Sequence, residues 1–174
     1  MDEHRLGLKP IRRGQWVRKG HPFPVEVWPR YQWTWVFGFV RPTTGRVFFT
    51  LMPSVGLAEM STTLHAFARH VRAGPHRRVV LVLDGAGWHS GALDLPEGLH
   101  LVPLPAYSPE LQPAERLWPL LDEPLVNRAV RDLDELEALI CQRCRVLRTM
   151  RAEVRALTRF HWWRHIERTA PSLK

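Results

Sequence analysis

Three acidic side chains stand where carboxylates could bind divalent metal ions. Asp84 follows the most apolar run of the chain, 79–83, Glu115 lies within the stretch 108–118, and Asp2 stands near the start. Phosphodiester chemistry without a covalent enzyme intermediate often uses two divalent metals about 3.5–4 Å apart. Mg²⁺ prefers hard oxygen ligands and keeps several waters, so a few carboxylates suffice. Three carboxylates from separate segments therefore fit a two-metal phosphodiester site.

Each acid also has an ordinary structural interpretation. Asp84 precedes a glycine and could simply start a turn. Glu115 could be a surface side chain placed favourably near a helix N-terminus. Asp2 could belong to a solvated, frayed terminus. Only the joint pattern favours a metal site over these separate interpretations.

The elements that must position these acids follow from hydrophobic periodicity. We expect a strand end over residues 1–9, a basic loop or short hairpin over 10–30, and then two strands joined by a tight turn. A helix, two further strands and two helices complete the chain. The expected strands cover 31–40, 46–51, 78–84 and 99–104, and the expected helices cover 56–73, 108–121 and 133–157.

This order of elements predicts an α/β fold. An antiparallel hairpin that leads into a β-α-β unit is typical of a mixed sheet flanked by helices. Asp84 falls at the carboxyl end of the most apolar strand, and such ends face the crevice where α/β sheets bind ligands. The pattern divides the single expected domain, 1–174, into a first strand with a basic loop (1–30), a core (31–122) and a C-terminal basic helical region (123–174).

The composition narrows the class of partner. The chain has 174 residues, a net charge of +8 and a pI of about 10.7, which favours nucleic acid, although many basic folded proteins bind no polyanion. No apolar run reaches the roughly 18 residues that a membrane helix needs, and residues 1–5 carry no apolar signal region. We therefore expect a cytoplasmic protein with no membrane partner.

The basic loop is the leading candidate for DNA contact, because cations interleaved with an aromatic side chain suit phosphate binding and base stacking. The alternative is a solvated loop whose tryptophan packs on the core. Cys141 and Cys144 form one C-x-x-C without a second pair, which indicates plain thiols rather than a zinc site. The loop residues in question are Arg12, Arg13, Trp16, Arg18 and Lys19.

Two longer motifs carry a family resemblance. The stretch 81–90, LVLDGAGWHS, resembles the second-Asp motif of the mariner-like branch of DDE transposases, which includes bacterial insertion-sequence members. The stretch 104–118, LPAYSPELQPAERLW, closely resembles the third-acid motif of that family. The opening 2–8, with 16–20 after it, looks like the first-Asp segment. The resemblance covers nearly the whole chain, and its third motif is highly specific.

The resemblance implies a ribonuclease-H-like fold and the catalytic domain of a transposase. By position, Asp2, Asp84 and Glu115 correspond to the catalytic acids that bind two Mg²⁺ or Mn²⁺ ions, and His89 to a supporting residue near the site. The implied reaction is hydrolysis of a phosphodiester at the element's end, followed by attack of the freed 3′-hydroxyl on target DNA. The implied partners are double-stranded DNA and a second copy of the chain.

The sequence also departs from the family pattern. Gly85 and Gln112 each stand where the family usually has asparagine. The helix-turn-helix modules of the family, and most of the strand expected to hold Asp2, are not found in these 174 residues. A separately encoded or frameshifted N-terminal DNA-recognition segment would supply them. The alternative is a truncated, inactive DNA-binding or oligomerising remnant.

Overall fold

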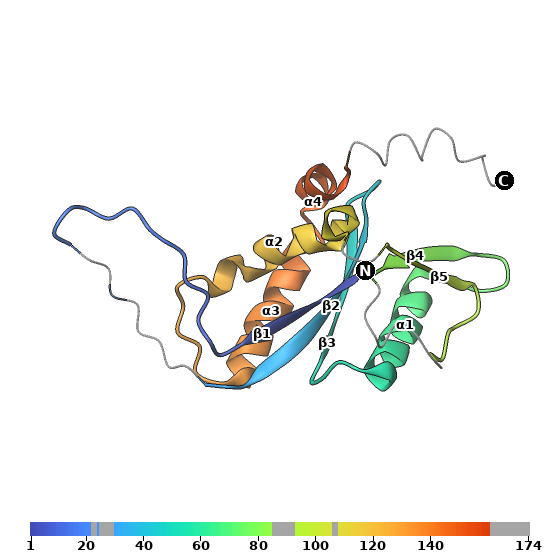
Figure 1. Cartoon of the computed structure of the whole chain (residues 1–174), viewed down its shortest axis with the longest axis horizontal. Coiled ribbons are helices and arrows are strands. Elements are labelled where there is room, and N and C mark those ends of the chain that lie inside the picture. Colours follow the sequence, from blue (N-terminus) through green and yellow to red (C-terminus); the bar gives the residue numbers. More distant parts are fainter. Residues whose placement is uncertain (22–23, 25–29, 85–92, 106–107, 161–174) are drawn as a thin grey trace.

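The computed structural model describes residues 1–21, 24, 30–84, 93–105 and 108–160 (Figure 1). Its strands and helices appear in the order that the sequence predicts, and no helix in these ranges is long and apolar enough to span a membrane. The strands are β1 (Asp2–Gly7), β2 (Trp33–Arg41), β3 (Arg46–Met52), β4 (Val79–Leu83) and β5 (Leu99–Pro103). The helices are α1 (Leu57–Val71), α2 (Trp118–Asp122), α3 (Leu133–Leu147) and α4 (Arg151–Thr158), with short 3₁₀ turns η2 (Pro109–Leu111), η3 (Pro113–Leu117) and η4 (Glu123–Leu125).

Strands β1, β2 and β3 form an antiparallel sheet with β2 at its centre. β2 is apolar on both faces because helices cover both, and successive side chains of a strand point to opposite sides. Val36 therefore packs with the cluster around α2 and α3, whereas Phe37 and Phe39 pack with the cluster around α1. In this register Asp2 lies opposite Gly38.

Strands β4 and β5 form a separate parallel pair. The α-ammonium group of Met1 donates a hydrogen bond of 2.5 Å to the carbonyl of Val82, so the start of β1 meets the carboxyl end of β4. This contact joins the antiparallel sheet to the parallel pair. The predicted combination of an antiparallel hairpin with parallel strands in an α/β fold is confirmed.

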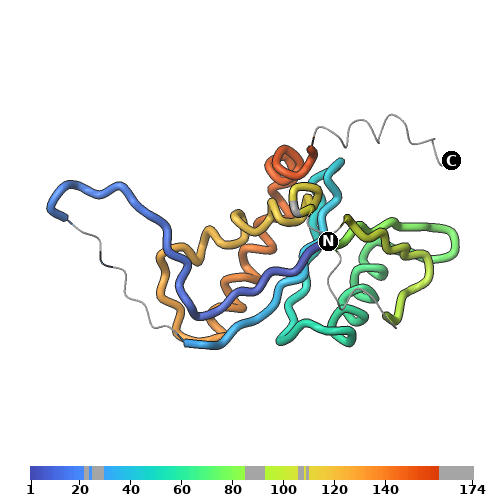
Figure 2. The backbone as a smooth tube through the Cα atoms, viewed as in Figure 1, coloured from blue at the N-terminus to red at the C-terminus, as the bar shows by residue number. Residues whose placement is uncertain are grey.

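Helices lie on both sides of the antiparallel sheet (Figures 1 and 2). The helix α1 buries one stripe at spacings of three and four residues. That stripe packs against β2 and β4 through Phe39, Leu81 and Leu83. The helices α2, α3 and α4 cover the opposite face. The buried residues of the α1 stripe are Met60, Thr63, Leu64, Phe67 and Ala68.

The helix predicted over 108–121 is wrong for most of its length. The chain there forms η2 and η3, and only five residues from Trp118 are α-helical. Proline explains the difference, because it has no amide hydrogen and its ring clashes with the carbonyl four residues earlier. Pro113 would meet the carbonyl of Pro109 in a continuous helix. Pro119 is tolerated because it falls in the first turn of α2.

The single helix predicted over 133–157 is instead two helices. α3 ends at Leu147 and α4 begins at Arg151. At the break, Thr149 Oγ1 donates to the carbonyl of Val146 at 2.7 Å, which offers the backbone an alternative to the helical pattern. The break lets α4 lie across the β2–β3 turn, where a Cβ at Gly45 would come within 1.9 Å of the Arg151 carbonyl oxygen.

The described residues that follow β1, 8–21, project from the rest of the molecule as an arm (Figure 2). Every residue from 12 to 21 is exposed, and residues 8–21 contain an isolated bridge between Ile11 and Val126 and a turn at 19–20, but no strand. The base of this arm is fixed, since Asn127 donates from its backbone to the Ile11 carbonyl at 2.8 Å. Within the described residues, the arm is therefore the loop form of the two predicted alternatives.

Candidate active site

Asp2, the first residue of β1, points to the side of the sheet that carries α2. Its carboxylate Oδ2 accepts a 2.7 Å hydrogen bond from Nε1 of Trp118, the first residue of α2. Burial raises the pKa of the Asp2 carboxyl, the Trp118 hydrogen bond opposes this rise, and the charges of Glu3 and Asp84 add to it. The first predicted acid is therefore held in a defined orientation rather than frayed.

Gly38 makes room for Trp118. A Cβ at this position would come within 2.5 Å of Cη2 and 3.0 Å of Cζ3 of the indole. Because Gly38 lies opposite Asp2 in the register, the ring can cross β2 and reach the carboxylate. The missing side chain at position 38 is thus a requirement of the site.

His4 contacts the same tryptophan, Trp118. It lies two residues after Asp2 and so on the same face of β1. Its ring stacks on Trp118 with centroids 4.9 Å apart and an interplanar angle of 12°. Its Nε2 lies 2.9 Å from Oδ1 of Asp122, at the end of α2. Asp122, His4 and Trp118 together fix the position of α2 relative to β1.

The second and third predicted acids come from other segments. Asp84 directly follows β4, and the Leu83 carbonyl accepts a 2.7 Å bond from the amide of Leu104, so the strand is fixed up to its last residue. Glu115 lies in η3 and is exposed. Pro113 begins η3, and the buried Ala114 and Leu117 hold it against the core.

The three acids influence one another electrostatically. The pKa of Glu115 is raised, first by partial burial, then by the charge of Asp2 and, more weakly, by Asp84. Asp84 also contributes to the raised pKa of Asp2. Like charges close together disfavour each other's ionisation, and a divalent cation would relieve that repulsion.

The donor chemistry fits a hard divalent cation, since all three groups are carboxylates. Among the described residues, however, no three His, Cys, Asp or Glu side chains stand close enough together to form a metal site. The fold therefore brings the three acids into electrostatic range without closing them into a ligand shell.

The other predicted site residues lie either in the arm or outside the described residues. Residue 89 lies outside the described residues, so the supporting role of His89 stays a prediction. The arm residues Arg12, Trp16, Arg18 and Lys19 are exposed, and Trp16 does not pack on the core. The Arg13 guanidinium is also exposed but lies 2.7 Å from Glu123 Oε2.

The C-x-x-C pair behaves as plain cysteines, because both are free thiols on α3. Burial raises the pKa of the Cys144 thiol to about 12, so this group is not a reactive thiolate near neutral pH.

Sequence reasoning missed the residues that hold the first acid. Trp118 was assigned only to the third-acid motif, and Gly38 only to a strand. Their interaction depends on β1, β2 and α2 meeting, which sequence spacing does not show. The one available signal was a glycine within an otherwise aromatic and β-branched strand, since such glycines often mark a close approach.

Comparison with known proteins identifies the family and the fold. A family model described as "DDE superfamily endonuclease" matches residues 1–137. An uncharacterized protein of Sinorhizobium fredii, y4pE/y4sA, is 36% identical over 111 residues, which are 63% of this chain and 81% of that protein.

Solved structures of the Mos1 transposase share the fold. The mariner Mos1 paired end complex with Mg has a TM-score of 0.65 at 16% identity, over 99% of this chain and 55% of that one. The Mos1 strand transfer complex has a TM-score of 0.55 at 17% identity, over 92% and 54%. This chain thus spans about half the length of the Mos1 chains. With the family model matched over most of its length, the chain belongs to the DDE superfamily of endonucleases.

Proposed function

We propose that this chain is the catalytic domain of a transposase that hydrolyses DNA phosphodiesters and then joins the freed 3′ end to target DNA. Asp2, Asp84 and Glu115 are the catalytic acids, and they bind two Mg²⁺ or Mn²⁺ ions. The observation that carries the proposal is the 2.7 Å hydrogen bond from Trp118, three residues after Glu115, to Asp2, which brings the segments of the first and third acids together. The mutual charge effects of the three acids support it. The Mos1 complexes with Mg and with Mn have the same fold, which supports the choice of ions.

Each acid has a distinct structural role. Trp118 fixes one oxygen of Asp2, so the carboxylate enters the site already oriented. Asp84 directly follows the apolar strand β4, and Glu115 lies exposed on the turn η3 that precedes α2. Metal ions bound between such carboxylates lower the pKa of a bound water and stabilise charge on the phosphoryl oxygens.

The DNA partner fits the charge of the chain, which is +8. We assign DNA contact to Arg12, Arg18 and Lys19 of the arm, with Trp16 available for stacking because its side chain is fully exposed. Arg13 contributes less, since Glu123 partly neutralises it. Mos1 transposase with transposon end DNA shares the fold.

Two protein partners complete the proposal. A second copy of the chain would allow two element ends to be held together, and the projecting arm offers exposed apolar groups for that contact. A separately encoded segment would supply recognition of the DNA ends. The exposed large side chains of the arm and the residues next to it are Trp16, Val17, Tyr31 and Trp33.

The experiment is a nicking assay on supercoiled plasmid in millimolar Mg²⁺ or Mn²⁺. We expect metal-dependent nicking that falls at least about 100-fold, or about 2.7 kcal/mol, in Asp84→Ala. Asp94→Ala is the matched control, because Asp94 is a largely exposed acid that contacts His65 of α1. Its nicking should equal that of the wild type.

Two results would decide against the proposal. Equal nicking by Asp84→Ala and the wild type would show that this acid is not catalytic. Plasmid binding by the wild type without any nicking, together with no uptake of Mn²⁺ in calorimetry, would instead support an inactive DNA-binding remnant.

A further inference from the structure

Two hydrogen bonds attach the segment around Glu115 to the start of β1. Trp118, three residues after Glu115, donates from Nε1 to Asp2 Oδ2 at 2.7 Å. Gln112, three residues before Glu115, donates from its side-chain Nε2 to the Met1 carbonyl, also at 2.7 Å. Because Met1 and Asp2 are adjacent, the residues on either side of η3 are both attached to the strand that carries the first acid.

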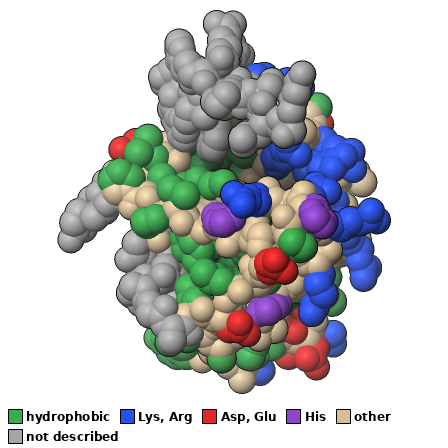
Figure 3. Space-filling model, turned by 90° about the vertical axis from the view of Figure 1, so that its right-hand side faces the viewer, with side chains coloured by type: hydrophobic (Ala, Val, Ile, Leu, Met, Phe, Trp, Pro, Cys, Tyr) green, Lys and Arg blue, Asp and Glu red, His purple; other side chains and the backbone are tan. Residues whose placement is uncertain are grey.

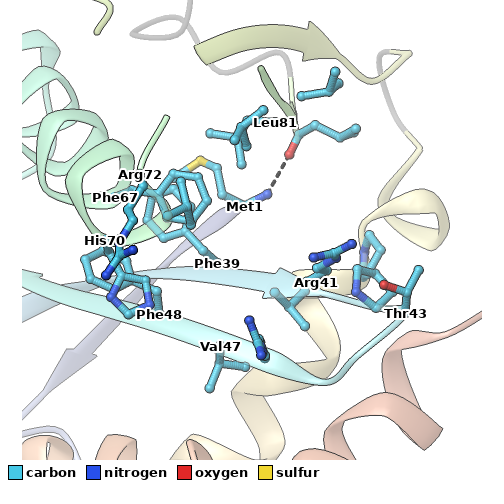
Figure 4. A pocket seen from close by; sticks show the side chains of 18 of the residues that line it. Met1, Phe39, Arg41, Thr43, Val47, Phe48, Phe67, His70, Arg72 and Leu81 are labelled. Atoms are coloured by element: carbon cyan, nitrogen blue, oxygen red, sulfur yellow. Dashed lines mark hydrogen bonds between the residues drawn. The ribbon is translucent and has the colours of Figure 1, made fainter. Parts of the chain in front are cut away.

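The same part of β1 also contacts the segment of the second acid. The backbone nitrogen of Met1 donates to the carbonyl of Val82 at 2.5 Å, and Val82 lies two residues before Asp84. Figure 4 shows this bond as a dashed line from Met1 to the strand that carries Leu81. Through its backbone nitrogen and carbonyl, Met1 therefore connects the end of β4 with Gln112, and the three acid-bearing segments meet at one residue.

The surroundings of Gln112 indicate that its amide does not serve stability. The side chain is 2% exposed, and its Oε1 is buried without a hydrogen-bond partner among the described residues. A buried acceptor without a donor costs at least as much free energy as a typical hydrogen bond contributes. The bond to the Met1 carbonyl therefore adds little net stability, and its effect is to fix where β1 lies relative to η3.

We propose that Gln112 is a positioning residue for the metal-binding acids. Through the Met1 carbonyl, it sets the distance between Asp2 and Glu115. Trp118 attaches η3 to β1 at one end only, and the bond from Gln112 attaches the other end. The inference rests on the proposed function, in which these acids bind Mg²⁺ or Mn²⁺.

The spacing of the acids matters because two divalent ions in a phosphodiester site lie about 3.5–4 Å apart. Mg²⁺ demands near-ideal octahedral geometry, so a displaced carboxylate weakens its binding. DNA contact depends on other groups. Figure 3 shows Lys and Arg side chains gathered along one edge of the face that it draws, whereas Gln112 is buried. Loss of the Gln112 amide should therefore weaken metal binding and leave DNA binding unchanged.

The test uses Gln112→Met, which keeps the length of the side chain but has no amide donor. Mn²⁺ affinity in calorimetry should fall at least about tenfold, as it does when groups that orient metal ligands are removed. The Mg²⁺ concentration for half-maximal plasmid nicking should rise by a similar factor, while the KM for plasmid stays within about twofold. Gln142→Met is the matched control, because Gln142 is exposed on α3, and it should behave as the wild type.

A second measurement needs neither metal nor DNA. Hydrogen exchange of the Trp118 indole, followed by NMR, reports on its bond to Asp2. Loss of the Gln112 contact loosens the start of β1, so this exchange should be at least about fivefold faster in Gln112→Met and unchanged in Gln142→Met. Melting temperatures within about 4 °C of the wild type will show that both variants are folded.

Gln112→Asn is the second variant, in case Gln112→Met does not fold. It keeps a polar amide but draws the donor back from the Met1 carbonyl by one carbon–carbon bond. We expect the same loss of Mn²⁺ affinity and the same faster exchange of the indole.

The two measurements distinguish this inference from the proposed function. If the wild type nicks DNA with metal, but Gln112→Met has unchanged Mn²⁺ affinity and unchanged indole exchange, the positioning role is overturned and the function stands. If the indole exchanges faster in Gln112→Met, but the wild type neither binds Mn²⁺ nor nicks DNA, the proposed function is overturned and Gln112 still positions Asp2.

Discussion

Met1 and Asp2 are adjacent in the chain but face opposite sides of the antiparallel sheet. On the Asp2 side, Trp118 fills the space above Gly38 so tightly that a single added carbon would clash. On the Met1 side, a cavity of about 710 Å³ remains between β2 and β4. The side that carries the acid is thus closely packed, while the other side is hollow.

Burial also shifts the pKa values of these two residues in opposite directions. Desolvation lowers the pKa of the Met1 ammonium from 8.0 to about 6, because burial disfavours a positive charge. Burial raises the pKa of the Asp2 carboxyl, because it disfavours a negative charge. Burial therefore shifts both groups towards their neutral forms, and their effects on stability fall in different pH ranges.

The largest expected effect concerns the Met1 amine. Between pH 6 and 8 the unfolded chain binds this proton more strongly than the folded one, so stability rises with pH through that range. A shift of about two units corresponds to roughly 3 kcal/mol. Chemical denaturation of the wild type at pH 6 and pH 8 measures the rise. An N-terminally acetylated chain should not show it, and an equal rise in that chain would mean that another group titrates.

Trp118→Phe tests the closely packed side. It keeps an aromatic ring against His4 but removes the donor to Asp2, and a hydrogen bond to a charged group contributes about 1.5–3 kcal/mol. We expect a loss of stability of this size and weaker Mn²⁺ binding in calorimetry. Trp16→Phe, at a fully exposed position, is the control and should change neither quantity. Unchanged Mn²⁺ affinity in Trp118→Phe would show that the indole hydrogen bond does not influence metal binding.

Gly38→Ala places a methyl group against the same indole. Overpacking of this kind costs about 1–3 kcal/mol, which lowers Tm by about 2–4 °C for each kcal/mol in a chain of this size. Gly74→Ala is the matched control, since no atom lies within 4 Å of a Cβ there. Melting temperatures are measured by circular dichroism. Equal values for the two variants would show that the Trp118 indole can move aside at little cost in free energy.

The smallest expected effect is that of Asp2→Asn on the pH dependence of stability. The pKa of Asp2 in the folded state is raised from 3.8. The stability that Asp2 contributes is therefore fully present below pH 3.8 and is lost as the pH rises through the raised pKa. The Trp118 hydrogen bond opposes the rise, which keeps the effect modest. The variant should melt higher than the wild type at pH 7 and equally at pH 3.5. A lower Tm for the variant at pH 7 would contradict the expectation that the buried Asp2 carboxylate destabilises the fold at that pH.

Much of the fold could be predicted from periodicity. The strands at 33–41, 46–52, 79–83 and 99–103 and the helix α1 lie within one or two residues of their predicted bounds. The failures were local. Pro113 interrupts the helix expected after Ser108, and the break at Thr149 carries no glycine or proline to announce it. At that break, packing of α4 across Gly45 decides the outcome.

The sequence alone predicted the three acids and the strand that ends directly before Asp84, because these features are local. It predicted a helix around Glu115, where the structure has the short turn η3. Only the tertiary structure decided that Trp118 holds Asp2, that Gly38 must lack a side chain, and that a cavity borders Met1. Those features arise where segments more than 30 residues apart in the sequence meet. Contacts of that kind depend on strand register and helix placement, which residue spacing does not specify.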